Sequence, residues 1–142
     1  MKQVYPTFIV KHNNDYLVYV PDMDIYTEGK TMADAIEMAR DAIGLKGIDL
    51  EDDKKILPPS SSSEEAIAKA KANCDILDYS QGILTLVDVN FKEYRQRMDN
   101  KAVRRNVTLP NWLNREAEKA QINVSRVLQD ALINALGLSR KY

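Results

Sequence analysis

The sequence predicts an α+β fold for roughly its first hundred residues and a smaller strand–helix–helix unit after them. Apolar, β-branched runs near the N-terminus precede a helical pattern, and another strand-like run follows much later. An antiparallel meander followed by a helix and a later strand is typical of a small sheet layered with helices. With 142 residues, the chain has room for two small domains. We place them at residues 1–98 and 101–139, joined by the polar residues 99–101.

Four segments have the composition of strands. Residues 4–10 (VYPTFIV) and 16–20 (YLVYV) flank the turn signal HNND and predict a hairpin. Pro6 cannot donate to a ladder, which favours an edge or a strand-start position for the first run. Residues 25–28 form a short third strand that ends at Gly29, and residues 83–90 (ILTLVDVN) are the most strand-like run of the chain.

Three helices accompany these strands. Thr31 is the expected N-cap of the first, with Asp34 in the capping-box position and a stripe of small and apolar residues behind it. Gly44 or Gly47 should end that helix. A surface loop (EDDKK, then PPSSSS) leads to a second helix capped by Ser63, and a third helix, FKEYRQRM, starts after Asn90. The sequence therefore reads β-β-β-α, loop, α, β, α.

The net charge of −1 conceals two regions of opposite charge. Residues 1–100 hold 12 Lys+Arg against 18 Asp+Glu, a balance of −6, and residues 101–142 hold 8 against 3, a balance of +5. An acidic body followed by a basic tail suggests two different partners.

The sequence also favours a cytoplasmic location for the protein. No apolar run approaches the ~18 residues of a membrane span. The N-terminal MKQVYPTFIV has a short apolar stretch and no small-residue cleavage site, so we predict no signal peptide and no membrane partner. Cys74 is the single cysteine, which fits a reducing cytoplasm.

No residue pattern points to catalysis. His12 is the only histidine and lies in a turn signal, and Cys74 has no signature around it. A two-metal nuclease site needs acids that converge from strand ends. The first strand has none, and Asp88 stands alone on the last. We therefore expect a protein that is not an enzyme, with no catalytic residue, no metal site and no cofactor.

The tail carries the sharper signal. Alternation in residues 103–109 would bury Val107 and Leu109 and leave Arg104, Asn106 and Thr108 on the opposite face. Arginine, asparagine and threonine are residue types that read base edges of DNA. Two such strands, one from each of two chains, form an antiparallel ribbon that enters the major groove. The alternative is an ordinary edge strand with a polar outer face.

Two helical patterns follow Pro110 and strengthen the DNA-binding interpretation. The first helix has Asn111 as its expected N-cap. The second begins at Asn123 or Ser125, with Gly137 just past its end, and its first turn offers backbone N–H groups to a phosphate while Arg126 adds positive charge. One copy of this tail buries too little to offset chain entropy, so we expect a dimer. Its predicted core comprises Val107, Leu109, Leu113, Leu128 and Leu132.

These residues resemble a known family. The run RRNVTLPNWLNREAEKAQINVSRVLQDALINALGL is similar to the ribbon-helix-helix DNA-binding domain of bacterial repressors and antitoxins. The part before it is similar to the HicB antitoxin domain through YPTFIV, YLVYVPDMD, YTEGKTMADAIEMARDAI, the PPS loop and LTLVDVNFKEY. The order and spacing of these segments carry the resemblance, which covers nearly the whole chain.

The resemblance implies an antitoxin of a type II toxin–antitoxin system. Its N-terminal domain would be a degenerate RNase H-like fold without nuclease activity that masks HicA, a small toxin that cleaves mRNA through a histidine. Its C-terminal domain would repress its own operon as a dimer or higher oligomer. The groove-facing positions of the family fall on Arg104, Asn106 and Thr108, and the phosphate anchor falls on Asn123 and Ser125.

The toxin contact is less defined by the resemblance. Many members carry a Pro-Gly-Cys type segment after the second strand, whereas this chain reads MDIYTEG. Because the N-terminal part is acidic, we place the contact with a basic toxin at Asp22, Asp24 and Glu28. Two alternatives stay open: a stand-alone repressor whose N-terminal domain senses a small ligand, and a metal-dependent RNase that would need Asp88.

Overall fold

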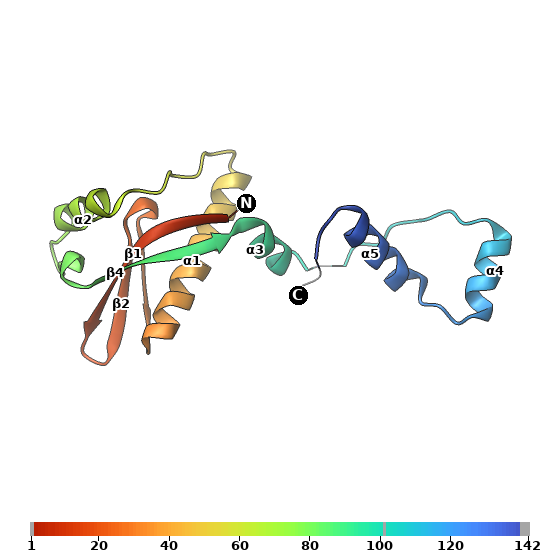
Figure 1. Ribbon diagram of the computed structural model, residues 1–142, viewed down its shortest axis with the longest axis horizontal. Helices are drawn as coiled ribbons and strands as arrows, with labels where there is room; N and C mark the ends of the chain where they lie inside the picture. Colours follow the sequence, from red (N-terminus) through yellow and green to blue (C-terminus); the bar gives the residue numbers. More distant parts are fainter. Residues whose placement is uncertain (1, 101, 140–142) are drawn as a thin grey trace. The chain divides into compact units, whose positions relative to one another are not determined.

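The structure, a computed structural model, describes residues 2–100 and 102–139, which divide into two compact units (Figure 1). The first unit ends at Asp99 and the second begins at Asn100. Within the first unit a four-stranded antiparallel sheet has the order β3-β2-β1-β4. Its strands are β1 (Lys2–His12), β2 (Asp15–Val20), β3 (Ile25–Gly29) and β4 (Ile83–Asn90). The predicted α+β class with a small antiparallel sheet is confirmed.

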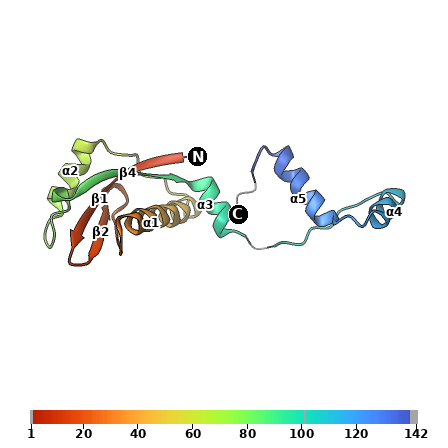
Figure 2. The ribbon, with the colours of Figure 1, turned by 60° about the horizontal axis from the view of Figure 1, so that its bottom comes forward.

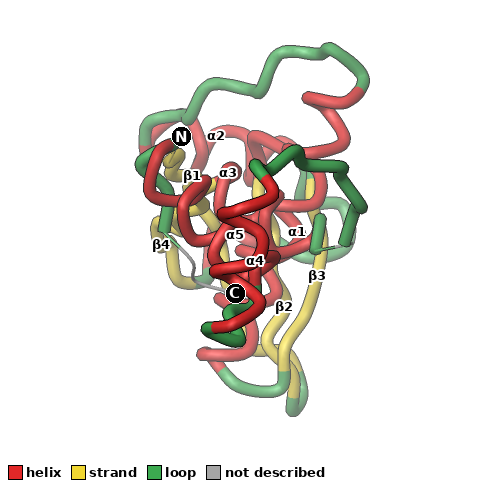
Figure 3. Tube along the Cα trace, turned by 90° about the vertical axis from the view of Figure 1, so that its right-hand side faces the viewer, coloured by secondary structure: helices red, strands yellow, loops and turns green. Residues whose placement is uncertain are grey.

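The first strand is longer and more central than its proline predicts. Strands β3 and β4 form the two edges of the sheet (Figure 3), and β1 lies between β2 and β4. The expectation of an edge or a strand-start position was therefore wrong for the strand as a whole, and the register shows how Pro6 is accommodated. The β1–β2 ladder begins only at Phe8, whereas Pro6 pairs with Leu86 of β4. At Pro6 the strand has a neighbour on one side only, so its missing N–H interrupts no second ladder.

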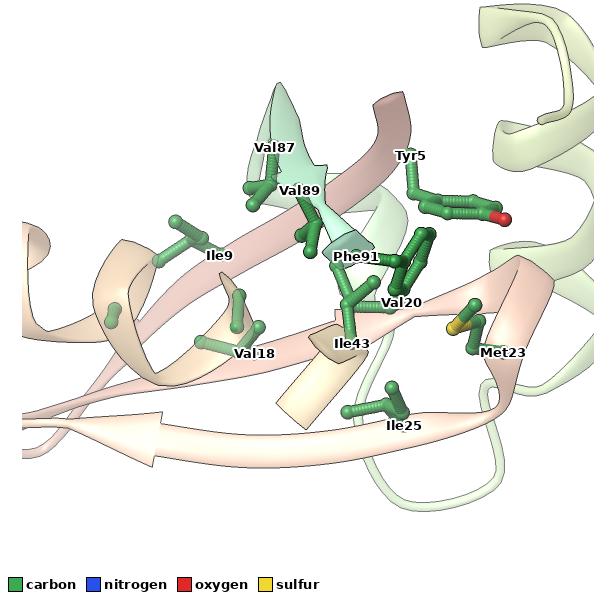
Figure 4. Packing of buried hydrophobic residues seen from close by; sticks show 12 residues of the cluster. Tyr5, Ile9, Val18, Val20, Met23, Ile25, Ile43, Val87, Val89 and Phe91 are labelled. Atoms are coloured by element: carbon green, nitrogen blue, oxygen red, sulfur yellow. The ribbon is translucent and has the colours of Figure 1, made fainter. Parts of the chain in front are cut away.

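Alternate residues of the strands face two different helices. Ile9 and Val18 point to α1 (Met32–Asp52), whereas Phe8 and Tyr19 point to α2 (Ser63–Ala72). Figure 2 shows the two helices on opposite sides of the sheet. The α1 side holds the larger core, which Figure 4 shows in detail and which consists chiefly of Tyr5, Ile9, Val18, Val20, Met23, Ile43, Val87, Val89 and Phe91.

The sequence predicts that α1 ends at Gly44 or Gly47, but the helix continues through both glycines to Asp52. The two glycines make room for α3 (Phe91–Met98) instead of stopping the helix. A Cβ on Gly44 would lie 2.7 Å from the Tyr94 ring, and one on Gly47 would collide with the Phe91 ring. Tertiary packing therefore outweighs the low helix propensity of glycine at both positions.

Helix α3 is also fastened to α1 by polar contacts. The Tyr94 hydroxyl donates to Asp41 Oδ1 at 2.5 Å, and Arg95 Nη2 lies 3.0 Å from carboxylate oxygens of Glu51 and Asp52. Burial, together with the hydrogen bond to Asp41 and the charge of that residue, raises the pKa of Tyr94 to about 12. These contacts hold α3, the last element of the first unit, against α1.

The helix starts follow the predicted capping residues closely. Thr31 accepts a hydrogen bond from Asp34 N at 3.1 Å, and Asn90 accepts one from Glu93 N at 3.3 Å, as expected. The cap of α2 is Ser62 rather than Ser63, because the Ser62 hydroxyl is the oxygen that accepts from Glu65 N. One serine among four adjacent serines cannot be chosen from composition alone. Short 3-10 turns at Pro21–Met23 (η1) and Tyr79–Gln81 (η2) complete the unit.

The second unit consists of an extended segment and two helices, α4 (Asn111–Lys119) and α5 (Val124–Ala135). Pro110 rather than Asn111 is the N-cap of α4, because its carbonyl already accepts from Asn114 N at 3.0 Å. Asn123 caps α5 through its side chain, and Gly137 follows the helix with φ 67°, as the sequence predicts.

Candidate functional site

The extended segment at the start of the second unit has no strand partner among the described residues. Residues 102–110 adopt no regular hydrogen-bonded structure, and Val107 and Leu109 are 56% and 38% exposed. An isolated strand leaves its backbone N–H and C=O groups without ladder partners. The ribbon predicted here needs a second chain, so within one chain it stays a prediction.

The two tail helices also expose apolar side chains. Of the predicted dimer core, Leu113 and Leu132 are exposed and Leu128 is half-buried. Trp112, which precedes Leu113 in α4 and was not among the predicted core residues, is 68% exposed. Such an apolar surface on a small unit favours association, because covering it removes apolar area from water.

The residues predicted to anchor a phosphate lie at the N-terminus of α5. Asn123 Oδ1 accepts a hydrogen bond from Arg126 N at 3.2 Å, so its oxygen serves the helix itself. Ser125 is exposed in the same turn. The Arg126 guanidinium lies 3.6 Å from Asp130, and both side chains are more than half exposed. An exposed ion pair of this kind contributes little to stability, so another anion can replace Asp130 beside Arg126.

In the acidic unit, the structure corrects the role of Asp22. Its side chain is completely buried, and it accepts hydrogen bonds from Ser61 N at 2.8 Å, from the Ser61 hydroxyl, and from Lys69 Nζ at 2.7 Å. Burial by itself would raise the pKa of Asp22, but the hydrogen bonds from Lys69 and Ser61 outweigh it and lower the pKa. Asp22 fastens the serine-rich loop and α2 to η1 and has no surface to offer a partner.

The other two predicted toxin-contact residues are exposed. Asp24 follows η1 with φ 51°, and Glu28 lies on the edge strand β3. Both side chains belong to the β3 side of the sheet, and Tyr26 lies between them in the sequence. The structure therefore keeps two acids of the predicted set at one edge and adds an aromatic residue to them.

Sequence reasoning missed the aromatic cluster around Tyr26. The Tyr26 ring stacks on Tyr19 with centroids 4.8 Å apart and an interplanar angle of 19°, and Tyr79 closes the group at 6.0 Å from Tyr26. Tyr19 is buried, whereas Tyr26 is 55% exposed. Burial, the neighbouring Tyr19 and the charge of Asp24 raise the pKa of the Tyr26 phenol. Tyrosines at residues 19, 26 and 79 share no motif, so only the fold brings them together.

Comparison with known proteins identifies the family. Residues 5–131 match the family described as HicB-like antitoxin of bacterial toxin–antitoxin systems. The chain belongs to this family. A phage protein, the uncharacterised 14.9 kDa protein of the rep–hol intergenic region of Haemophilus phage HP1 (strain HP1c1), is 34% identical over 113 residues, which are 78% of this chain and 75% of the phage protein. The resemblance to the HicB antitoxin family is confirmed.

Two solved structures share the fold. A chain of a toxin–antitoxin complex from Streptococcus pneumoniae aligns with a TM-score of 0.59 and 22% identity, covering 95% of this chain and 99% of that one. The antitoxin HicB of Burkholderia pseudomallei aligns with a TM-score of 0.52 and 26% identity, covering 94% and 98%. The α+β arrangement with a small antiparallel sheet is thus a feature that this chain shares with them.

The described residues of this HicB-like chain bear on two further expectations. Within residues 2–100 and 102–139, no group of three or more His, Cys, Asp or Glu side chains is placed to hold a metal ion. Asp88, the acid that a nuclease would need, lies 3.2 Å from Lys2 and 3.4 Å from Arg40, in surface ion pairs. In the same residues no helix has the length and apolar character that crossing a membrane requires.

Proposed function

We propose that this antitoxin neutralises a HicA-type mRNA-cleaving toxin through its first unit and represses its own operon through its second. The observation that carries the proposal is the family match over residues 5–131, which covers most of both units. The first unit has a core of its own and an acidic surface. The second is basic and exposes apolar side chains, which supports a role that two chains perform together.

The toxin-binding half follows from charge and from the related complex. Residues 1–100 have a balance of −6, which suits a basic ribonuclease as partner. The related structure from Streptococcus pneumoniae is that of a toxin–antitoxin complex. We assign the contact to the β3 side of the sheet, with Asp24 and Glu28, and leave Asp22 to its internal role.

The DNA-binding half rests on the extended segment of the tail. Two such segments, one from each chain, would pair as an antiparallel ribbon and satisfy each other's backbone groups. Val107 and Leu109 would turn to the helices, and Arg104, Asn106 and Thr108 would face the major groove. Asn123, Ser125 and Arg126 at the start of α5 would contact a phosphate through a helix N-terminus.

The same pairing would form the dimer. Val107, Leu109, Leu113 and Leu132 are exposed in one chain and are the side chains that a second copy would cover. Because polar residues would read the groove and apolar ones would join the chains, DNA binding and dimerisation would depend on separate faces of the tail.

The toxin half is tested with the neighbouring gene. Co-expression of this chain with the small protein encoded beside it should yield a stable complex and restore growth that the small protein alone suppresses. If the adjacent reading frame encodes no small basic protein, or the two proteins do not copurify, the neutralising role is wrong.

The DNA half is tested on the promoter of the same operon. Arg104→Ala and Asn106→Ala should each weaken specific binding by about 1–3 kcal/mol for each lost base contact, measured by fluorescence anisotropy at a fixed salt concentration. Lys119→Ala is the matched control, since Lys119 is exposed on α4 and pairs with Glu116 at 3.7 Å. Equal affinity of wild type and both ribbon variants would remove the ribbon from the proposal.

A further inference from the structure

The face of the sheet opposite α1 is only partly covered by α2. That helix packs with its alanines on Phe8 and Tyr19 and stops short of the β3 edge. The segment between α2 and η2 then passes beside β2 and β3 and leaves a hollow of about 320 Å³. We call the apolar side chains at this hollow the Tyr26 patch, which consists of Leu17, Tyr26, Ile76, Leu77 and Tyr79.

Tyr26 is held in place although more than half of it is exposed. Its ring stacks on Tyr19, and Tyr19 is fixed in turn by burial and by a hydrogen bond from Asn73 Nδ2 to its hydroxyl at 3.0 Å. An aromatic side chain that is rigid before binding loses little conformational entropy when a partner covers it. Rigid, exposed aromatics of this kind are the residues that dominate binding energy at protein interfaces.

The hollow beside Tyr26 offers room for a side chain from a partner. Ile76 at its rim is 100% exposed, so it contributes nothing to the core of the unit. Leu17, Leu77 and Tyr79 are half-buried and form an apolar lining. Isolated exposed apolar residues are common on protein surfaces, but a grouped set around a hollow marks an interaction site.

Acidic residues surround the patch. Asp75 lines the same hollow, and Glu28 lines an adjoining one together with Tyr26 and Tyr79. Asp24 is exposed two residues before Tyr26. An apolar centre with an acidic rim suits a partner segment that carries an apolar side chain flanked by lysine or arginine. An arginine or lysine can also lie over the exposed face of Tyr26, where ring and cation attract each other.

We propose that the Tyr26 patch is the docking site for the toxin, which would place an apolar side chain in the hollow and basic groups against Glu28, Asp75 and the Tyr26 ring. The inference rests on the proposed antitoxin function and names the surface that performs it. Charge favours this occupant over others. A second copy docked symmetrically here would bring Glu28 and Asp75 of both chains together, and DNA would be repelled by the same acids.

The test uses the whole 142-residue chain and a catalytically inactive variant of the toxin encoded beside it. Titration calorimetry would compare wild type with Tyr26→Ala, Glu28→Lys and Ile76→Ser. Each should weaken toxin binding by about 10- to 100-fold, as expected of residues near the centre of an interface. Because Ile76 is fully exposed, its substitution leaves folding unaffected and keeps the test decisive if Tyr26→Ala unfolds β3.

Two matched controls lie elsewhere on the first unit. Leu86→Ala removes an apolar side chain that is 64% exposed on β4, and Asp49→Lys reverses an exposed acid on α1. Both should bind the toxin as wild type does, and circular dichroism should show the same fold for all variants. Controls that lose as much affinity as the patch variants would show that general surface character, not the patch, governs binding.

The remaining outcomes separate the proposal from the function on which it rests. If wild type binds the toxin and the three patch variants bind equally well, the docking site is wrong and the antitoxin function stands. If wild type itself does not bind, the function fails with it. If Tyr26→Ala instead lowers the oligomeric state in light scattering at unchanged toxin affinity, the patch joins copies of this chain and the proposal is overturned.

Discussion

The two units of this antitoxin differ in how they remove apolar side chains from water. The first buries a continuous set between its sheet and α1, with Tyr5, Val18 and Ile43 completely enclosed. Among residues 102–139, by contrast, no side chain is fully buried, and Val107, Leu113 and Leu132 are exposed. A unit with a core of its own can fold alone, whereas one without a core takes its stability from a partner. The same division separates the acidic part of the chain from the basic part.

Truncating one apolar side chain in each unit tests this difference most directly. Leu132→Ala should destabilise the second unit by about 2–5 kcal/mol if two copies bury it, and by less than about 0.5 kcal/mol if it stays exposed. Analytical ultracentrifugation and thermal melts over a range of concentrations would distinguish the two outcomes, and Leu128→Ala should behave alike.

Ile43→Ala is the matched change in the first unit. Ile43 is completely buried against the sheet, so its truncation should also cost about 2–5 kcal/mol. In this variant the melting transition of the first unit should not vary with protein concentration, because that core belongs to one chain. If the transitions of both units depend on concentration, or if neither does, the two units do not differ in this way.

The buried carboxylate of Asp22 gives a second, smaller effect. Asp22→Asn removes the charge that Lys69 and Ser61 bind, and should cost about 1.5–3 kcal/mol at neutral pH in urea titrations. Since folding lowers the pKa of Asp22, its stabilisation is present above the unfolded value of 3.8 and is lost as the pH falls through the folded value. The gap between wild type and the variant should therefore shrink below about pH 4. A gap that is constant with pH would show that the charge of Asp22 is not the cause.

The smallest expected effect is at the helix glycines. Gly47→Ala adds a methyl group against the Phe91 ring, an overpacking that costs about 1–3 kcal/mol, while the better helix propensity of alanine returns about 1 kcal/mol. A modest net loss in the urea midpoint is expected. Measured in a Phe91→Ala background, the same substitution should become neutral or stabilising, because the ring that it meets is gone. The same loss in both backgrounds would mean that Phe91 is not what requires the glycine.

Patterns of neighbouring residues in the sequence predicted much of the fold. Thr31, Asn90 and Asn123 cap their helices as the capping pattern predicts, and Gly137 follows α5 with a positive φ. These features depend on neighbours in the chain, so the sequence contains them. Gly44, read locally, ends a helix, and only the distant Tyr94 ring explains why the helix continues past it.

The candidate site was harder to predict, because it too depends on contacts between residues that are distant in the sequence. Asp22, Asp24 and Glu28 look alike in sequence, yet Lys69 and Ser61, some forty residues away, bury the first and leave the others exposed. The cluster of Tyr19, Tyr26 and Tyr79 joins a central strand, an edge strand and a 3-10 turn. No spacing rule connects them. The alternation in the tail depends on neighbouring residues, so the sequence predicts a paired ribbon there, and within one chain that ribbon stays a prediction.

The serine-rich loop has a consequence for the lifetime of the protein. Residues 55–62 have no regular structure, yet Ser61 is bound by Asp22 and the Pro58 carbonyl accepts a hydrogen bond from Tyr5 at 2.8 Å. Proteases cut extended chain that has come away from the surface. Cleavage here would therefore require local opening of these contacts but not unfolding of the sheet. The resistance of this loop to cleavage would then be set by a few hydrogen bonds, largely apart from the overall stability of the protein.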